Sequence, residues 1–154
     1  MNVRYFENPA ELAAAVAAEV VRVIEDSLTP AIGFFEPPDL PEIVRQLRHE
    51  PLRRRWSERD VAWFLVSGEP ADGLIFQQPL SGEDAAGALQ RLALGRLDLA
   101  VAGGVTPECA GSILEARRRA ILEIGGQDLA PSLAWPEDPS TWWYKLGDHE
   151  NPGR

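Results

Sequence analysis

The sequence has little of the residue types on which most catalytic and metal-binding sites depend. It contains one cysteine, Cys109, and two histidines, His49 and His149. A single cysteine excludes an internal disulfide, and the chain has no cysteine cluster that could hold a structural zinc ion. A serine or cysteine nucleophile requires a histidine that a third group orients, and neither histidine lies in such a pattern. We therefore expect a protein that is not an enzyme, with no catalytic residues, no metal site and no cofactor.

Positive charge and long apolar runs are also scarce. The net charge is −9, and Lys145 is the one lysine beside the arginines. This balance argues against nucleic acid as a partner, because neutralising phosphates requires a positive surface. No apolar run approaches the roughly 20 residues that span a bilayer, so we expect no membrane partner and a cytoplasmic location. With 45% hydrophobic residues over 154 positions, the chain has the composition of one globular domain.

Local signals predict about four helices. The first begins with the capping pattern of Asn8, Pro9 and Glu11. The other three are expected near residues 42–49, 82–94 and 107–124, each bounded by capping residues, proline or glycine. The apolar face of the first helix recurs every fourth residue and comprises Leu12, Val16, Val20, Ile24 and Leu28.

These helices predict an α+β fold that is mainly helical, with a small sheet or hairpin. Residues 61–67 and 97–102 are uninterrupted apolar runs that fit a buried strand or a buried helix equally well. Residues 1–130 are expected to form the globular domain. Residues 131–154 are rich in proline and tryptophan and have no clear period, so we expect an extended C-terminal arm.

Two groups of side chains are candidates for binding a partner chain. One is the aromatic run of Trp142, Trp143 and Tyr144, which is expected either to anchor the arm in the core or to contact a second chain. The other is a cluster of arginines in the expected helix 42–49 and in the segment that follows it, with Arg53, Arg54 and Arg55 at its centre. Such a cluster fits an acidic partner, or a solvated face with internal ion pairs.

A glycine pair followed by Thr-Pro is the other candidate site. Backbone N–H groups at a turn that leads into a helix attract anions, so Gly103, Gly104 and Thr106 form a possible anion site or a simple capped turn. Residues 95–107 resemble the strand and loop of the 6-phosphogluconolactonase and glucosamine-phosphate deaminase family, and residues 3–21 are similar to its first helix. This resemblance implies that the three residues hold a sugar phosphate. A strand at 97–102 would favour the anion site, and a helix would favour a helical hairpin.

A second resemblance rests on a set of positions between residues 92 and 135, namely Leu94, Gly95, Leu97, Asp98, Ala102, Gly104, Val105, Gly125, Gly126 and Trp135. Through these positions the segment is similar to the C-terminal half of tail-assembly chaperones from long-tailed actinobacteriophages. It implies a helical hairpin and a partner chain that is bound during phage assembly.

Our main hypothesis is therefore a non-enzymatic interaction protein that binds another chain or a second copy of itself. We expect a bacteriophage assembly or small virion component, located in the cytoplasm or in a virion. The alternatives are a reduced sugar-phosphate-binding protein and a bacterial immunity or adaptor protein with a basic partner.

Overall fold

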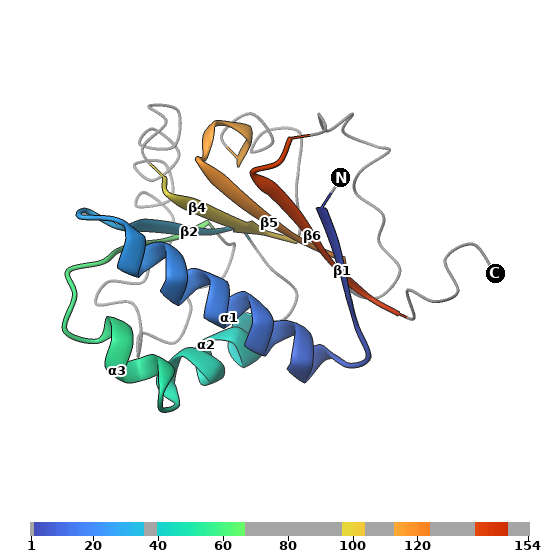
Figure 1. Cartoon of the computed structure of the whole chain (residues 1–154), viewed down its shortest axis with the longest axis horizontal. Coiled ribbons are helices and arrows are strands. Elements are labelled where there is room, and N and C mark those ends of the chain that lie inside the picture. Colours follow the sequence, from blue (N-terminus) through green and yellow to red (C-terminus); the bar gives the residue numbers. More distant parts are fainter. Residues whose placement is uncertain (1, 36–39, 67–96, 104–112, 124–137, 148–154) are drawn as a thin grey trace.

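A six-stranded parallel sheet forms the centre of the molecule (Figure 1). The computed structural model describes residues 2–35, 40–66, 97–103, 113–123 and 138–147. The elements follow one another as β1 (Asn2–Phe6), α1 (Pro9–Asp26), β2 (Ala31–Phe35), α2 (Leu40–Arg48), α3 (Leu52–Trp56), β3 (Ala62–Val66), β4 (Leu99–Ala102), β5 (Arg118–Glu123) and β6 (Thr141–Leu146).

Successive strands are added in opposite directions on the two sides of the middle of the sheet, although all strands are parallel. Across the sheet the strands lie in the order β1-β6-β5-β4-β2-β3. From β2 the chain moves outward to β3, whereas from β4 it moves the opposite way, through β5 to β6. The neighbours β2 and β4 therefore flank the point where the direction changes. In open parallel sheets such a point is the usual place for a ligand, at the carboxyl ends of the strands.

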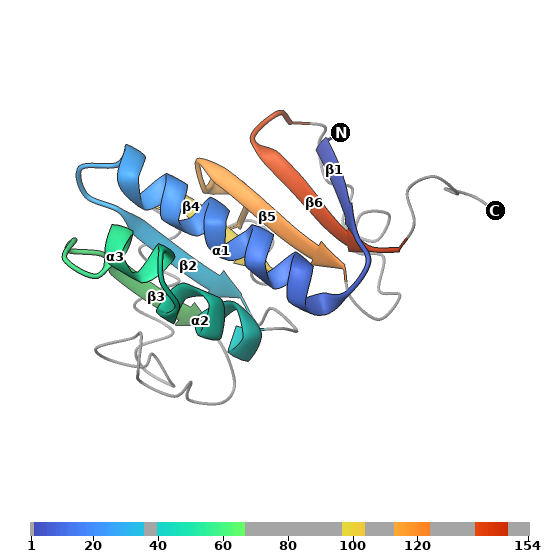
Figure 2. The same ribbon diagram turned by 60° about the horizontal axis from the view of Figure 1, so that its bottom comes forward.

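Helix α1 confirms the prediction at its start. The side chain of Asn8 accepts a hydrogen bond from the backbone N–H of Glu11 at 2.9 Å, and Pro9 takes the first position of the helix. The helix ends at Asp26, so Leu28 lies beyond it and is 99% exposed instead of extending the apolar face. Helices α1, α2 and α3 cover the same face of the sheet (Figure 2).

Both faces of the sheet are buried. On the face that carries α1, Phe34, Val101 and Tyr144 belong to one core cluster with the apolar side of that helix. On the opposite face, Phe35 and Trp143 belong to a second cluster, in which they are 1% and 3% exposed. Parallel strands that are buried on both faces have nearly continuous apolar sequences instead of alternating ones.

The expectation of a mainly helical α+β fold is wrong, because the sheet is an α/β-type parallel sheet. The two ambiguous runs form strands β3 and β4. The helix expected over 107–124 is wrong in its second half, where Arg118–Glu123 is strand β5 with five consecutive buried residues. The helical turn at 113–115 is all that the described residues retain of it. The helix expected over 82–94 lies outside the described residues.

The expectation of an extended C-terminal arm is also wrong over residues 141–146. These residues are strand β6, which lies between β1 and β5 and is parallel to both. The N-terminal strand thus completes the sheet by pairing with the C-terminal one, with Val3 opposite Trp143. The aromatic run therefore belongs to the core of the domain.

Candidate functional site

The segment 103–106, which the sequence predicts to be a turn and which is called the glycine turn below, begins at the carboxyl edge of the sheet, beside the point between β2 and β4 where the strand order changes direction. Strand β4 ends at Ala102, and the backbone N–H of Gly103 donates to the carbonyl oxygen of Phe35 at 3.3 Å, where β2 ends. Gly103 is therefore held against the end of β2. Gly104 and Thr106, the other two candidate residues, lie outside the described residues.

A pair of opposite charges lies at the same edge, at the ends of β5 and β6. The ammonium of Lys145 is 3.0 Å from the carboxylate of Glu123, whose side chain is 9% exposed. The two residues are neighbours in the register of the strands. Sequence analysis missed them because Glu123 falls within the expected helix and Lys145 within the expected arm. The sequence signal that could have identified them is a charged residue at or near the end of an apolar run: Glu123 is the last residue of β5, and Lys145 is the next to last of β6.

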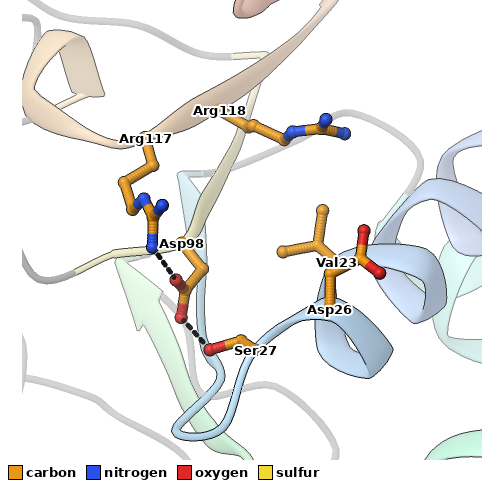
Figure 3. Close-up of a pocket in the computed structure, with 6 residues that line it drawn as sticks. All are labelled: Val23, Asp26, Ser27, Asp98, Arg117 and Arg118. Carbon is orange, nitrogen blue, oxygen red and sulfur yellow. Dashed lines mark hydrogen bonds and ion pairs between the residues drawn. The ribbon is translucent and has the colours of Figure 1, made fainter.

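A pocket of about 290 Å³ opens at the opposite, amino-terminal edge (Figure 3). Asp98 lies beside it and accepts hydrogen bonds from the Ser27 hydroxyl at 3.2 Å and from the Ala31 N–H at 2.9 Å. These bonds fix the connection between α1 and β2 against the start of β4. The lining residues are Val23, Asp26, Ser27, Asp98, Arg117 and Arg118.

The charges of this pocket largely compensate one another. Arg117 approaches Asp98 at 3.7 Å, and Arg118 forms an ion pair with Glu19 at 2.8 Å. Figure 3 shows the side chain of Arg117 pointing toward Asp98 and that of Arg118 pointing away from it. Because its two acidic and two basic lining residues balance, the pocket offers no net charge to an ionic ligand.

The arginine candidates lie on the surface of α3, largely in ion pairs. Arg55 pairs with Glu25 of α1, and the Arg54 Nε lies 3.5 Å from a Glu50 carboxylate oxygen. The guanidinium of Arg55 holds the pKa of Glu25 below its usual range. Arg53 is exposed and has no ion pair within the part of the chain that the structure describes. The internal ion pairs expected as the alternative are therefore present.

The aromatic candidates are core residues. Tyr144 is 1% exposed and stacks on Phe6 with ring centres 5.8 Å apart, and burial raises the pKa of its hydroxyl. Strand β6 lies near one edge of the sheet, whereas α3 lies near β3 at the other (Figure 2). Trp142, Trp143 and Tyr144 therefore do not form one surface with the arginines.

Buried polar contacts also fix the start of β5. The Arg119 guanidinium donates to the carbonyl oxygens of Ile113 and Leu114 and to the Asp138 carboxylate. Hydrogen bonds from Ser140, and next from Arg119, lower the pKa of Asp138 to about 2. Each of the three guanidinium nitrogens donates to a protein group, so the side chain joins the amino ends of β5 and β6.

The described residues contain no group of three or more His, Cys, Asp or Glu side chains that could hold a metal ion. None of the described helices is long and apolar enough to cross a membrane. Cys109 and His149 lie outside the described residues. Comparisons with protein-family models, with curated proteins and with solved structures give no match.

Proposed function

We propose that this protein binds a phosphorylated small molecule at the turn after β4, where Gly103, Gly104 and Thr106 would surround the phosphate. One observation carries the proposal: residues 99–102 form a strand in the middle of a parallel sheet, beside the point between β2 and β4 where the strand order changes direction. This is the arrangement in which a glycine turn can present free N–H groups to an anion. A helix at this position would have removed the basis for the site.

The chemistry of the turn suits a phosphate in a protein of net charge −9. Backbone N–H groups and one hydroxyl attract an anion through hydrogen bonds and need no cluster of cationic side chains. The resemblance to the sugar-phosphate family implies the same three residues. The proposal concerns binding, and no reaction is assigned to the turn.

Thermal unfolding with ligand tests the proposal. We expect 6-phosphogluconate or inorganic phosphate to raise the Tm by roughly 5–10 °C at a concentration 100-fold above Kd. Thr106→Arg should abolish the rise, because a long side chain would fill the turn. Thr29→Arg is the matched control, since Thr29 is exposed and precedes the amino end of β2, at the opposite edge of the sheet from Gly103. No shift with either ligand at millimolar concentration would contradict the proposal.

A second candidate function is binding of another protein chain, as expected for a phage assembly or virion component. The observation that favours it is the exposed basic end of α3, where Arg53 is free of described ion pairs and the Arg54 side chain is 82% exposed. In an acidic protein this patch is complementary to the rest of its own surface, so a second copy is the partner to test.

Sedimentation velocity at increasing protein concentration tests self-association. We expect a salt-sensitive dimer that the double variant Arg53→Glu, Arg54→Glu abolishes. Arg117→Glu, at a side chain that is 79% exposed, is the control and should still associate. A monomer at every concentration in low salt would contradict this function.

A further inference from the structure

The pocket at the amino-terminal edge of the sheet is lined by residues that the structure describes. Its volume of about 290 Å³ is close to the lower end of the roughly 300–1,000 Å³ that ligand pockets span. At about 30 Å³ for each molecule of liquid water, this equals the volume of roughly ten water molecules. The pocket is therefore of a size that holds a small metabolite.

Two arginines at the start of β5 form one side of this pocket (Figure 3). Arg117 has a side chain that is 79% exposed, and it lies 3.7 Å from Asp98, which is too long for a hydrogen bond. Arg118 donates from one guanidinium nitrogen to Glu19 at 2.8 Å. The other nitrogens of these two guanidinium groups form no hydrogen bond with a described residue. Since a guanidinium has five N–H donors that match the geometry of a carboxylate, this side suits a carboxylate group.

Asp26, the last residue of α1, supplies negative charge from another side of the pocket. Its side chain is exposed and forms no hydrogen bond or ion pair with any residue that the structure describes. Arg22 interacts with Asp26 through charge alone, because its guanidinium donates to Glu19 from both Nε and Nη2. The last turn of α1 contains no basic residue, so the negative end of the helix dipole adds to the charge of Asp26. This side therefore suits a cation.

The remaining lining residues give the pocket a fixed wall. The Oδ2 of Asp98 accepts hydrogen bonds from the Ser27 hydroxyl and the Ala31 N–H, so this carboxylate is oriented by the protein itself. Val23, which is 6% exposed, adds apolar surface. The groups that are left for a ligand are thus the guanidinium groups at β5 and the carboxylate at the end of α1.

We propose that this pocket binds a free α-amino acid in its zwitterionic form, with the carboxylate at Arg117 and Arg118 and the ammonium at Asp26. A ligand with a single charge would be attracted by one side and opposed by the other, because the lining charges balance. A zwitterion complements both sides and leaves the balance unchanged. The site is at the opposite edge of the sheet from Gly103, so the inference is independent of the proposed phosphate site.

Thermal unfolding of the full chain with each of the standard amino acids, tested singly at millimolar concentration, is the first experiment. At least one of them should raise the Tm, because a ligand that binds the folded state alone stabilises it. Calorimetry then compares the amino acid that gives the largest rise with two analogues, the same acid without its amino group and the amino acid amide. Each analogue should bind at least about fivefold more weakly, because each lacks one charged contact that is partly exposed to water.

Two variants assign the contacts to residues. Asp26→Asn should reduce the preference for the amino acid over its deaminated analogue to less than about twofold, whereas Asp60→Asn, the same change at another exposed aspartate, should keep the full preference. Arg117→Gln should weaken binding of the amino acid and of the deaminated analogue alike, whereas Arg53→Gln should weaken neither. The side chains that are changed are exposed, so we expect folded variants, which circular dichroism checks.

The outcomes that overturn the inference are distinct. If none of the amino acids raises the Tm, the pocket does not bind this class of ligand. If the deaminated acid binds as tightly as the amino acid, the ammonium contact is absent and the ligand is not recognised as a zwitterion. If Asp60→Asn lowers the preference as much as Asp26→Asn does, the effect comes from the net charge of the protein and the assigned site is wrong.

Discussion

Replacing Trp143 by alanine should destabilise the whole domain. The side chain is 3% exposed and belongs to the core cluster that includes Phe35 and Ile121. Removing a buried tryptophan or phenylalanine side chain costs about 3–5 kcal/mol, because the lost apolar contact is joined by a cavity that the surroundings do not fill. Domains have total stabilities of about 5–15 kcal/mol, so Trp143→Ala would remove a large share.

Urea unfolding followed by far-UV circular dichroism measures this loss without relying on tryptophan fluorescence. With a slope of about 2 kcal/mol per molar urea, the midpoint should fall by roughly 1.5–2.5 M. Trp143→Phe, which leaves a smaller cavity, should lose about 1–2 kcal/mol and keeps the test informative if the alanine variant does not fold.

Tyr5→Ala is the control for this measurement. Tyr5 is 37% exposed on the edge strand β1, so its removal should cost less than about 1 kcal/mol. A loss below about 1 kcal/mol for Trp143→Ala as well would refute the reasoning. In that case residues 141–146 would not be a core strand, and the idea of a separate arm would regain its basis.

Two further predictions concern the polar contacts at the start of β5. Arg119→Met should cost about 3 kcal/mol in urea unfolding, because it leaves the carbonyl oxygens of Ile113 and Leu114 without their donor; a cost below about 1 kcal/mol would contradict this role. Asp138→Asn should lower stability by a constant amount above about pH 4, and the difference should shrink toward pH 2. The reason is that the folded pKa of Asp138 is about 2 against an ordinary value of 3.8, so its contribution is complete above the unfolded pKa and is lost as the pH falls through the folded one. A difference that stays constant down to pH 2 would exclude this carboxylate as its source.

The helix at the N-terminus could be predicted because its signals are local. Asn8 caps the first turn, Pro9 suits the first helical position, and the apolar residues recur with the period of a helix. The same kind of signal placed a helix near residues 42–49, where α2 lies. The end of α1 was misplaced, since Leu28 continues the apolar period although it lies two residues beyond Asp26, the last helical residue.

The sheet could not be predicted in the same way, because its signals are not local. Strand β4 has the sequence LAVA and is buried on both faces, so it has no alternation that distinguishes a strand from a buried helix. Strand β5 follows a helical turn, and alanines and isoleucines at helical spacing continue into it. Its assignment depends on pairing with β4 and β6, which no short window of the sequence contains.

Strand β6 is the extreme case. It pairs with β1, so residues at opposite ends of the chain lie side by side, with Asn2 opposite Trp142. Proline and tryptophan around this strand gave it the composition of an arm. Its buried position follows from long-range pairing with two strands, and composition carries no information about such pairing.

The same property of the sheet explains which part of the candidate site the sequence revealed. A glycine pair before Thr-Pro is visible in any window, so Gly103, Gly104 and Thr106 were found as candidates. Glu123 and Lys145 become candidates only when the strands are aligned in parallel, because that alignment brings the ends of successive apolar runs to one edge. Phe35, Gly103, Glu123 and Lys145 all lie at or next to such an end. An apolar run can fit either a strand or a helix. If it is a strand of a parallel sheet, the polar residue at its end therefore indicates a possible binding site; if it is a helix, that residue does not indicate a site.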